Sequence, residues 1–139
     1  MDKFNKKYRK INNLKQPLFN ERYLCMDPAP PVVFITEGIY DALSLEDVGV
    51  PAIALVGVGA RHLIDICARH RPKTHFMIGL DNDDTGKQAA DSLAYWFATL
   101  HIDFTLYVPP YGKDWNDSLK YARPSLYDWT HSICREYTE

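Results

Sequence analysis

The chain has 139 residues, of which 46% are hydrophobic and 24% are charged. This length and composition are typical of a single globular domain with a buried core. The formal net charge of −2 at pH 7 excludes a protein that coats nucleic acid through general basicity. Contact with a polyanion would therefore depend on local basic clusters or on a bound metal ion.

Cysteine usage and hydropathy indicate where the protein works. Cys25, Cys67 and Cys134 are far apart and form no C-x-x-C pair, which argues against a disulfide framework or a zinc ribbon. No segment approaches the ~18 apolar residues of a membrane span, and the basic N-terminus leads into polar sequence. We therefore expect a cytoplasmic protein that does not enter a membrane.

Residues 1–31 show no regular hydrophobic period and end in a proline-rich stretch at 27–31. We predict a basic N-terminal arm and linker here, with the domain itself at residues 32–139. The arm is either a solvated tail or, through Phe4 and Tyr8, a nucleic-acid-binding segment. Its basic residues are Lys3, Lys6, Lys7, Arg9 and Lys10.

From residue 32 onward, short apolar runs alternate with segments of helical period. The runs predicted to be strands are residues 32–36, 52–56, 75–80 and 102–108. The segments predicted to be helices are residues 41–48, 61–70 and 85–100. This alternation is typical of an α/β fold, with a central, mostly parallel four-stranded sheet and helices on both faces.

The C-terminal tail, from residue 116, is expected to form two short helices broken at Pro124. Trp115, just before this tail, is interpreted as a packing residue and not as a platform for stacking bases.

Acidic side chains follow three of the predicted strands. Glu37 follows the first strand, Asp81 and Asp83 follow the third, and Asp114 and Asp117 follow the fourth. In open α/β sheets the functional crevice lies beyond the carboxyl ends of the strands. Carboxylates gathered there would repel one another unless a hard cation lay among them, and oxygen ligands favour Mg²⁺ or Mn²⁺. Because Mg²⁺ is commonly completed by substrate phosphates, the pattern favours phosphoryl or nucleotidyl transfer.

Any one of these acidic residues alone is more often a helix cap or a solvated turn. Asp84 and Thr85 are expected to cap the helix that follows Asp83. Asp41 is a secondary candidate because it lies one helical turn from Glu37. The coincidence at three strand ends is what favours the metal site.

Three segments together carry a family resemblance: Val33–Leu43, Gly79–Gly86 and Gly112–Asp117. In this order, and correctly placed on the predicted strands, they resemble the Toprim family over about residues 32–120. The resemblance implies a Toprim fold in which Glu37 is the acid/base or metal-associated glutamate and Asp81 and Asp83 hold Mg²⁺. Asp114 is a further metal-ligand candidate, and Asn116 and Asp117 are secondary site candidates.

Within the family, the E-G-x-x-D-A-L sequence from Glu37 looks like the primase branch, closest to phage and plasmid primases. That implies a DNA-directed RNA polymerase activity that synthesises primers in DNA replication. The implied partners are nucleotides and a single-stranded DNA template. The candidates for contact with phosphate are Arg61, His62, Lys87 and Lys113.

The chain departs from complete primases in three respects. It has no zinc-binding module, little of a basic template-binding subdomain and no helicase portion. Residues 16–20 resemble the segment that joins a primase's N-terminal subdomain to its Toprim core. We therefore expect a fragment that works with a replicative helicase or with missing primase subdomains, and not full priming by this chain alone.

Three alternatives stay open. A nuclease like the ribosomal-RNA maturases keeps the same carboxylates, and a non-catalytic Toprim scaffold would be expected to lose them. The spacing Asp81-x-Asp83-x-Thr85 is shared with haloacid-dehalogenase-type phosphatases, which place it on their first strand. Here it follows the third predicted strand, which disfavours that class.

Overall fold

A computed structural model describes residues 18–56, 59–109 and 114–138 of the chain. The strands are β1 (Val32–Thr36), β2 (Ala52–Ala54), β3 (His75–Ile78) and β4 (Phe104–Leu106). A short 3₁₀ helix, η1 (Glu21–Leu24), precedes them. The α-helices are α2 (Ile39–Asp47), α3 (Gly59–His70), α4 (Asp84–Thr99) and α5 (Trp115–Thr138).

The four strands form one parallel sheet in the order β2-β1-β3-β4. This confirms the predicted α/β fold, and every pairing among these strands is parallel. Three strands are shorter than their apolar runs suggested. At the start of the fourth run, for example, the Ile102 N–H bonds the carbonyl of Phe97 at the end of α4, so Ile102 belongs to the helix terminus.

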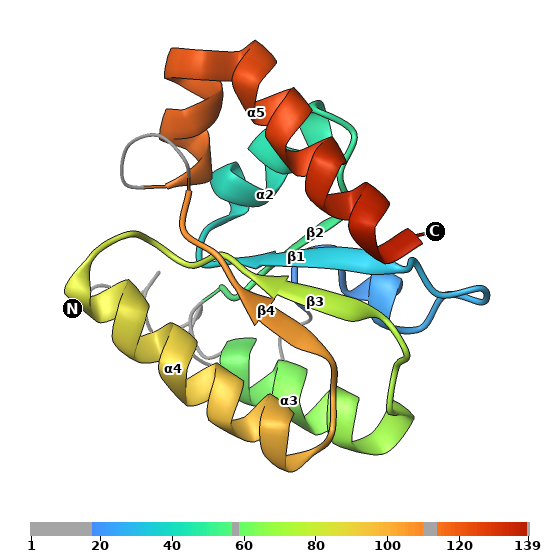
Figure 1. The fold of residues 1–139 in the computed structure, drawn as a ribbon. Coiled ribbons are helices and arrows are strands. Elements are labelled where there is room, and N and C mark those ends of the chain that lie inside the picture. Colours follow the sequence, from blue (N-terminus) through green and yellow to red (C-terminus); the bar gives the residue numbers. More distant parts are fainter. Residues whose placement is uncertain (1–17, 57–58, 110–113, 139) are drawn as a thin grey trace, which may run out of the picture.

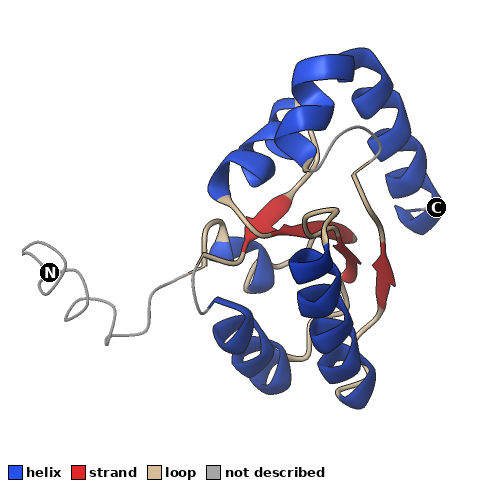
Figure 2. Cartoon of the chain, turned by 90° about the vertical axis from the view of Figure 1, so that its left-hand side faces the viewer, coloured by secondary structure: helices blue, strands red, loops and turns tan. Residues whose placement is uncertain are grey.

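Helices cover both faces of the sheet, with α2 and α5 on one face and α3 and α4 on the other, as Figure 1 and, from the side, Figure 2 show. Strand β1 explains this arrangement because all five of its residues are buried. Val33 and Ile35 point into the core under α3 and α4, whereas Val32 and Phe34 point into the core under α2 and α5. A strand buried on both faces needs a continuous apolar run instead of alternation.

The prediction of two C-terminal helices was wrong, because α5 is one helix of 24 residues that continues through Pro124. Figure 1 shows the axis of α5 changing direction along its length. A proline inside a helix removes one backbone hydrogen bond and clashes with the preceding turn, which bends a helix without having to end it.

The segment before β1 packs on the domain from residue 18 onward. Leu18 and Leu24 are buried in the core on the α3 and α4 side, and Phe19 forms an antiparallel bridge to Ala54. The Asn20 side chain donates to the carbonyl of Ala52 at 2.9 Å. Residues 18–24, which the sequence placed in a linker, therefore cover the outer side of β2.

Trp115 joins α5 to the sheet. Its side chain is fully buried, and its indole Nε1 donates to the carbonyl of Gly79 at 2.7 Å. It also packs edge-on against Phe34, with ring centroids 5.4 Å apart. A Cβ on Gly79 would lie 2.6 Å from the Trp115 ring, so glycine is required there. The interpretation of Trp115 as a packing residue is confirmed.

Replacing Trp115 by Phe should destabilise the protein. Phenylalanine cannot donate to Gly79, and a buried carbonyl that loses its partner costs about 1–3 kcal/mol, to which the smaller ring adds a cavity. We expect the free energy of unfolding, measured in urea, to fall by about 2 kcal/mol or more. Trp96→Phe, at a side chain that is 44% exposed on α4, is the matched control and should change it by less than about 0.5 kcal/mol. Equal effects of the two variants would contradict this role for Trp115.

Candidate metal centre

The neighbouring strands β1 and β3 bring the first acidic residues together. Chain order runs from β1 outward to β2 and from β3 outward to β4, so the direction of winding changes between β1 and β3. Ligand sites of open α/β sheets form at such a switch point. Glu37 follows β1 and Asp81 follows β3, and the Asp81 N–H donates to Glu37 Oε1 at 3.3 Å.

Asp41, Asp81 and Asp114 form a cluster at this edge, called here the aspartate cluster. Each offers one carboxylate oxygen, and these oxygens lie within 4.8 Å of one another. Asp41 comes from the first turn of α2, Asp81 follows β3, and Asp114 immediately precedes α5. Three segments far apart in sequence thus point their carboxylates at one place.

Backbone N–H groups hold two members of the cluster in position. Asp41 Oδ1 accepts from the Asn116 N–H at 3.1 Å, and Asp114 Oδ1 accepts from the Asp117 N–H at 2.8 Å. Both donors belong to the first turn of α5, whose N-terminal end carries partial positive charge. The Ser44 hydroxyl, 3.2 Å from Asn116 Oδ1, adds a second contact between α2 and α5. Asn116 and Asp117, secondary candidates from the sequence, therefore support the cluster through their backbone.

The cluster is electrostatically strained. Asp41 is only 7% exposed, and burial, with smaller contributions from Asp114 and Glu37, raises the pKa of its carboxyl to about 6. The hydrogen bonds from Asn116 and Gly38 act in the opposite direction. A divalent cation would remove this repulsion, and a donor set made only of carboxylate oxygens suits Mg²⁺ or Mn²⁺. The residues present therefore fit a hard cation held by Asp41, Asp81 and Asp114.

Asp83 has a different contact from the one expected. Its Oδ1 accepts from the Gly86 N–H at 2.7 Å, which makes Asp83 the N-cap of α4. The prediction that Asp84 and Thr85 cap this helix was wrong, since α4 begins at Asp84 itself. The aspartate cluster does not include Asp83, and its role as a metal ligand stays a prediction.

Gly86 allows the first turn of α4 to lie close to the backbone of Asp81, a member of the cluster. A Cβ at this position would lie 2.1 Å from the backbone carbonyl oxygen of Asp81. Because a backbone atom cannot move aside as a flexible side chain can, any larger residue would shift either α4 or the loop that carries Asp81. The glycine after the Asp-x-Asp pair thus positions a cluster residue.

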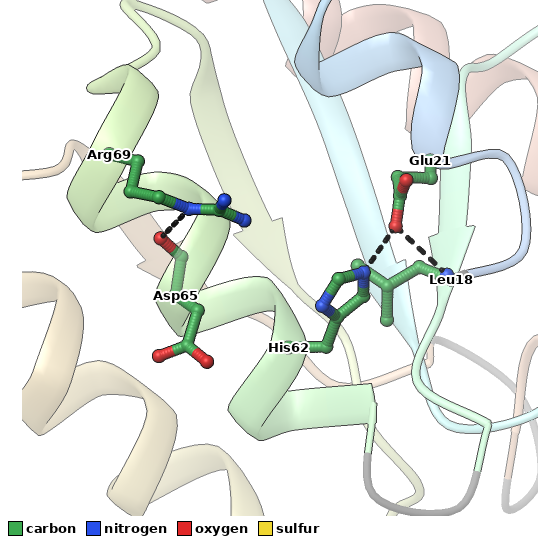
Figure 3. A network of polar contacts seen from close by, with 5 residues as sticks. All are labelled: Leu18, Glu21, His62, Asp65 and Arg69. Carbon is green, nitrogen blue, oxygen red and sulfur yellow. Dashed lines mark hydrogen bonds and ion pairs between the residues drawn. The ribbon is translucent and has the colours of Figure 1, made fainter. Parts of the chain in front are cut away.

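The predicted phosphate-binding residues lie in separate places. Lys87 is exposed in the first turn of α4 and borders a groove that also includes Asp81. Arg61 is exposed near the start of α3. His62 instead approaches η1, with its Nε2 2.6 Å from Glu21 Oε1, as Figure 3 shows. Lys113 lies outside the described residues.

Asp41 was a secondary candidate from the sequence, and the structure places it in the aspartate cluster. The available signal was its spacing of four residues from Glu37, which places both near the same edge. Its burial could not be anticipated, because the first turn of α5, 75 residues along the chain, supplies the N–H that its carboxylate accepts.

The fold and the site together define a class: an α/β domain with a cluster of carboxylates at the switch point of a parallel sheet. A family model described as the Toprim domain matches residues 32–123, and the chain belongs to this family. No curated protein sequence matched the chain.

Among solved structures, the chain is similar to the Aquifex aeolicus primase, in a crystal structure of its zinc-binding and RNA polymerase domains. The TM-score is 0.56 at 20% sequence identity, over 76% of this chain and 26% of that one. The likeness is therefore one of fold, and this chain corresponds to about a quarter of that protein's crystallised length. Of the helices that the structure describes, none has the length and apolar character needed to cross a membrane.

Gly86→Ala should destabilise the protein and disturb the cluster. Forcing a methyl group against a fixed backbone atom costs about 1–3 kcal/mol, so urea unfolding should show a loss of that order. Gly38→Ala is the control, because its Cβ would lie 3.6 Å from the nearest neighbouring atom, Asp41 Oδ2, which is ordinary van der Waals contact. A Gly86→Ala protein as stable as the wild type would show that this approach is not tight.

The raised pKa of Asp41 predicts a pH-dependent stability in the absence of divalent ions. The folded state binds this proton more tightly than the unfolded chain, whose pKa is near 3.8. The contribution of Asp41 to the free energy of unfolding is therefore complete below about pH 4 and is lost as pH rises from about 4 to 6. Asparagine keeps the oxygen that accepts from Asn116, so Asp41→Asn should gain in Tm over the wild type by a few degrees across this window, in chelator.

Asp128→Asn is the control for that titration, since Asp128 is exposed on α5. Its difference in Tm from the wild type should stay constant between pH 4 and 7. If the Asp41→Asn difference were equally constant, Asp41 would not be the group that titrates.

Proposed function

We propose that this chain is the Toprim catalytic portion of a primase-like enzyme that transfers nucleotides in a Mg²⁺-dependent reaction on nucleic acid. The observation that carries the proposal is the aspartate cluster with Glu37 beside it, at the switch point of the sheet. Membership of the Toprim family supports it, and so does the likeness of fold to a primase.

The chemistry of the cluster suits phosphoryl groups. A Mg²⁺ ion bound there would neutralise charge on phosphate oxygens and orient them. Asp41, Asp81 and Asp114 would supply its oxygen ligands, and Asp83 would stay near it as the cap of α4. The N–H groups of Asn116 and Asp117 keep two of these carboxylates aimed inward before any ion arrives.

Glu37 is proposed as the general acid or base. Its Oε1 accepts the Asp81 N–H, so the carboxylate is fixed beside the cluster, while the other oxygen can face a substrate. There it would take a proton from an attacking hydroxyl or give one to a leaving oxygen. Because Glu37 follows β1 and Asp81 follows β3, Glu37 is proposed to act on the substrate while Asp81 holds the metal ion.

The wider setting is proposed from the same comparison. We infer that residues 32–139 form the catalytic domain and that residues 1–31 form the segment that leads into it. The chain spans only 26% of the primase structure that it resembles, so we propose further primase subdomains or a helicase as its partners. The proposed reaction also needs single-stranded DNA as template and nucleotides as substrates. We propose that the protein works in the cytoplasm, as part of a phage or plasmid replication system.

Glu37→Gln should remove activity while metal binding remains. Glutamine keeps an oxygen to accept from Asp81, so the fold should be retained, and loss of a general acid or base typically lowers rate about 10²–10⁴-fold. Calorimetric Mg²⁺ or Mn²⁺ affinity should change little. Asp81→Asn, in contrast, should lower both metal affinity and product formation.

The assay uses labelled ribonucleotides, single-stranded DNA and Mn²⁺ or Mg²⁺, with detection of both oligomer synthesis and strand cleavage. Where the chain needs its missing subdomains, they are added as a separate polypeptide. Cleavage without synthesis would replace the primase proposal by a Toprim nuclease. Full activity of Glu37→Gln together with an inactive Asp81→Asn would exclude the role given to Glu37.

A further inference from the structure

A second groove runs between α3 and α4, on the face of the sheet opposite α2 and α5. Figure 1 shows these two helices side by side, and the groove between them has a volume of about 680 Å³. Small side chains line it from both helices, among them Ala60 and Ala68 of α3 and Ala89 of α4. Because small side chains leave space above a helix, this α3–α4 groove can receive a large side chain from outside.

Trp96 is a large side chain at the same groove. It lines the groove from α4, yet it is 44% exposed. Burying an aromatic side chain removes about 150–250 Å² from water, and tryptophan is enriched at the centres of protein interfaces. One surface thus carries both a projecting aromatic ring and the small residues that can receive one. A two-fold symmetric dimer needs this kind of self-complementary surface.

Two opposite charges border the groove on α3. Arg61 and Asp65 are both exposed and both line it. They are four residues apart, which is about 6 Å along the helix axis. If a second copy packs with its α3 antiparallel, Arg61 of each copy lies opposite Asp65 of the other, and the contact occurs twice. A parallel arrangement would instead bring like charges together, so charge complementarity favours the antiparallel dimer.

The residues of α4 fit the same arrangement. Each of the two helices returns from the carboxyl end of one parallel strand to the start of the next, so α3 and α4 run in the same direction. The lining covers residues 60–68 of α3 and 89–100 of α4. A two-fold axis near the middle of the groove that pairs Arg61 with Asp65 also places Trp96 of one copy over Ala89 of the other.

We propose that the α3–α4 groove is the interface of a homodimer, in which two copies pack antiparallel and each inserts Trp96 into the groove of the other. Helix α4 has 16 residues and is about 24 Å long, and two packed helices are about 20 Å wide. The resulting face of roughly 500 Å² per copy is smaller than the ~800 Å² of a standard interface. The dimer is therefore weak, with a Kd on the order of 10–100 µM.

The dimer leaves the metal centre open. Helices α3 and α4 both begin at the edge of the sheet that carries the aspartate cluster. Antiparallel packing therefore places the two clusters at opposite ends of the dimer, each accessible to its own substrate. The inference does not depend on the proposed function, and dimerisation should be the same with Mg²⁺ and with chelator.

Sedimentation equilibrium of the full chain between about 1 and 500 µM tests the dimer. The mean mass should rise from 16.0 kDa toward twice that value. At about 1 µM the chain is monomeric, so changes at Trp96 do not affect its unfolding through the dimer. Trp96→Ala should raise the Kd at least about 10-fold. Tyr40→Ala is the matched control, since Tyr40 is 77% exposed on α2, on the other face of the sheet, and should keep the wild-type Kd.

A charge exchange tests the alignment of the two copies. Arg61→Glu and Asp65→Lys should each weaken self-association, because each variant places like charges opposite one another at both contacts. An equimolar mixture of the two variants should dimerise with a Kd within about 3-fold of the wild type, since both contacts then join opposite charges. Mixing cannot repair a variant that is misfolded, so this recovery separates an interface contact from a contact within one copy.

Several outcomes would overturn the proposal. One is a mass that stays at the monomer value at every concentration, and another is a dimer that Trp96→Ala leaves unchanged, which would use a different surface. A Trp96-dependent dimer that the mixed variants fail to restore would contradict the antiparallel alignment. If the chain stayed monomeric but bound a separately added primase subdomain through Trp96, the groove would hold that polypeptide, and the proposal of a second copy would be wrong.

Discussion

The parallel pairing of β1 with β3 is the constraint on which the site depends. Their register pairs Ile35 with Ile78, so both strands reach the same edge at the same level. Glu37 and Asp81, two and three residues beyond those positions, must then emerge side by side. The rest of the site is added around this pair by α2, α4 and α5, each of which begins at that edge.

The carboxylates at this edge are held by backbone hydrogen bonds from neighbouring segments. Glu37, Asp41, Asp83 and Asp114 each accept an N–H, from Asp81, Asn116, Gly86 and Asp117 respectively. Such bonds favour the charged form of a carboxylate and fix its direction. The chain thereby keeps like charges close together, so that a cation finds its ligands already oriented and little rearrangement is needed when it binds.

Those parts of the fold that follow from the local hydrophobic pattern could be predicted from the sequence. The buried strand β1 follows from a continuous apolar run and the three crossover helices from segments of helical period. The acidic residues after β1 and β3 marked the edge at which the aspartate cluster lies. Features that depend on contacts between distant segments could not be predicted. The burial of Asp41 depends on α5, and Leu18 becomes a core residue only because the sheet lies beside it. Local rules also misplaced the cap of α4 and the end of the C-terminal helix, because tertiary packing can carry a helix through a proline.

The close approach of Gly79 and Gly86 to their neighbours has a consequence for how this site would look in a deep mutational scan. A Cβ would lie within 3 Å of the buried Trp115 ring at Gly79 and of the Asp81 backbone at Gly86, so substitutions at both positions should be depleted when variants are scored by activity. These glycines would then be indistinguishable from Glu37 or Asp81. A parallel score for protein abundance would separate them, since the glycine variants should lose folded protein, whereas isosteric changes at the carboxylates should leave abundance intact.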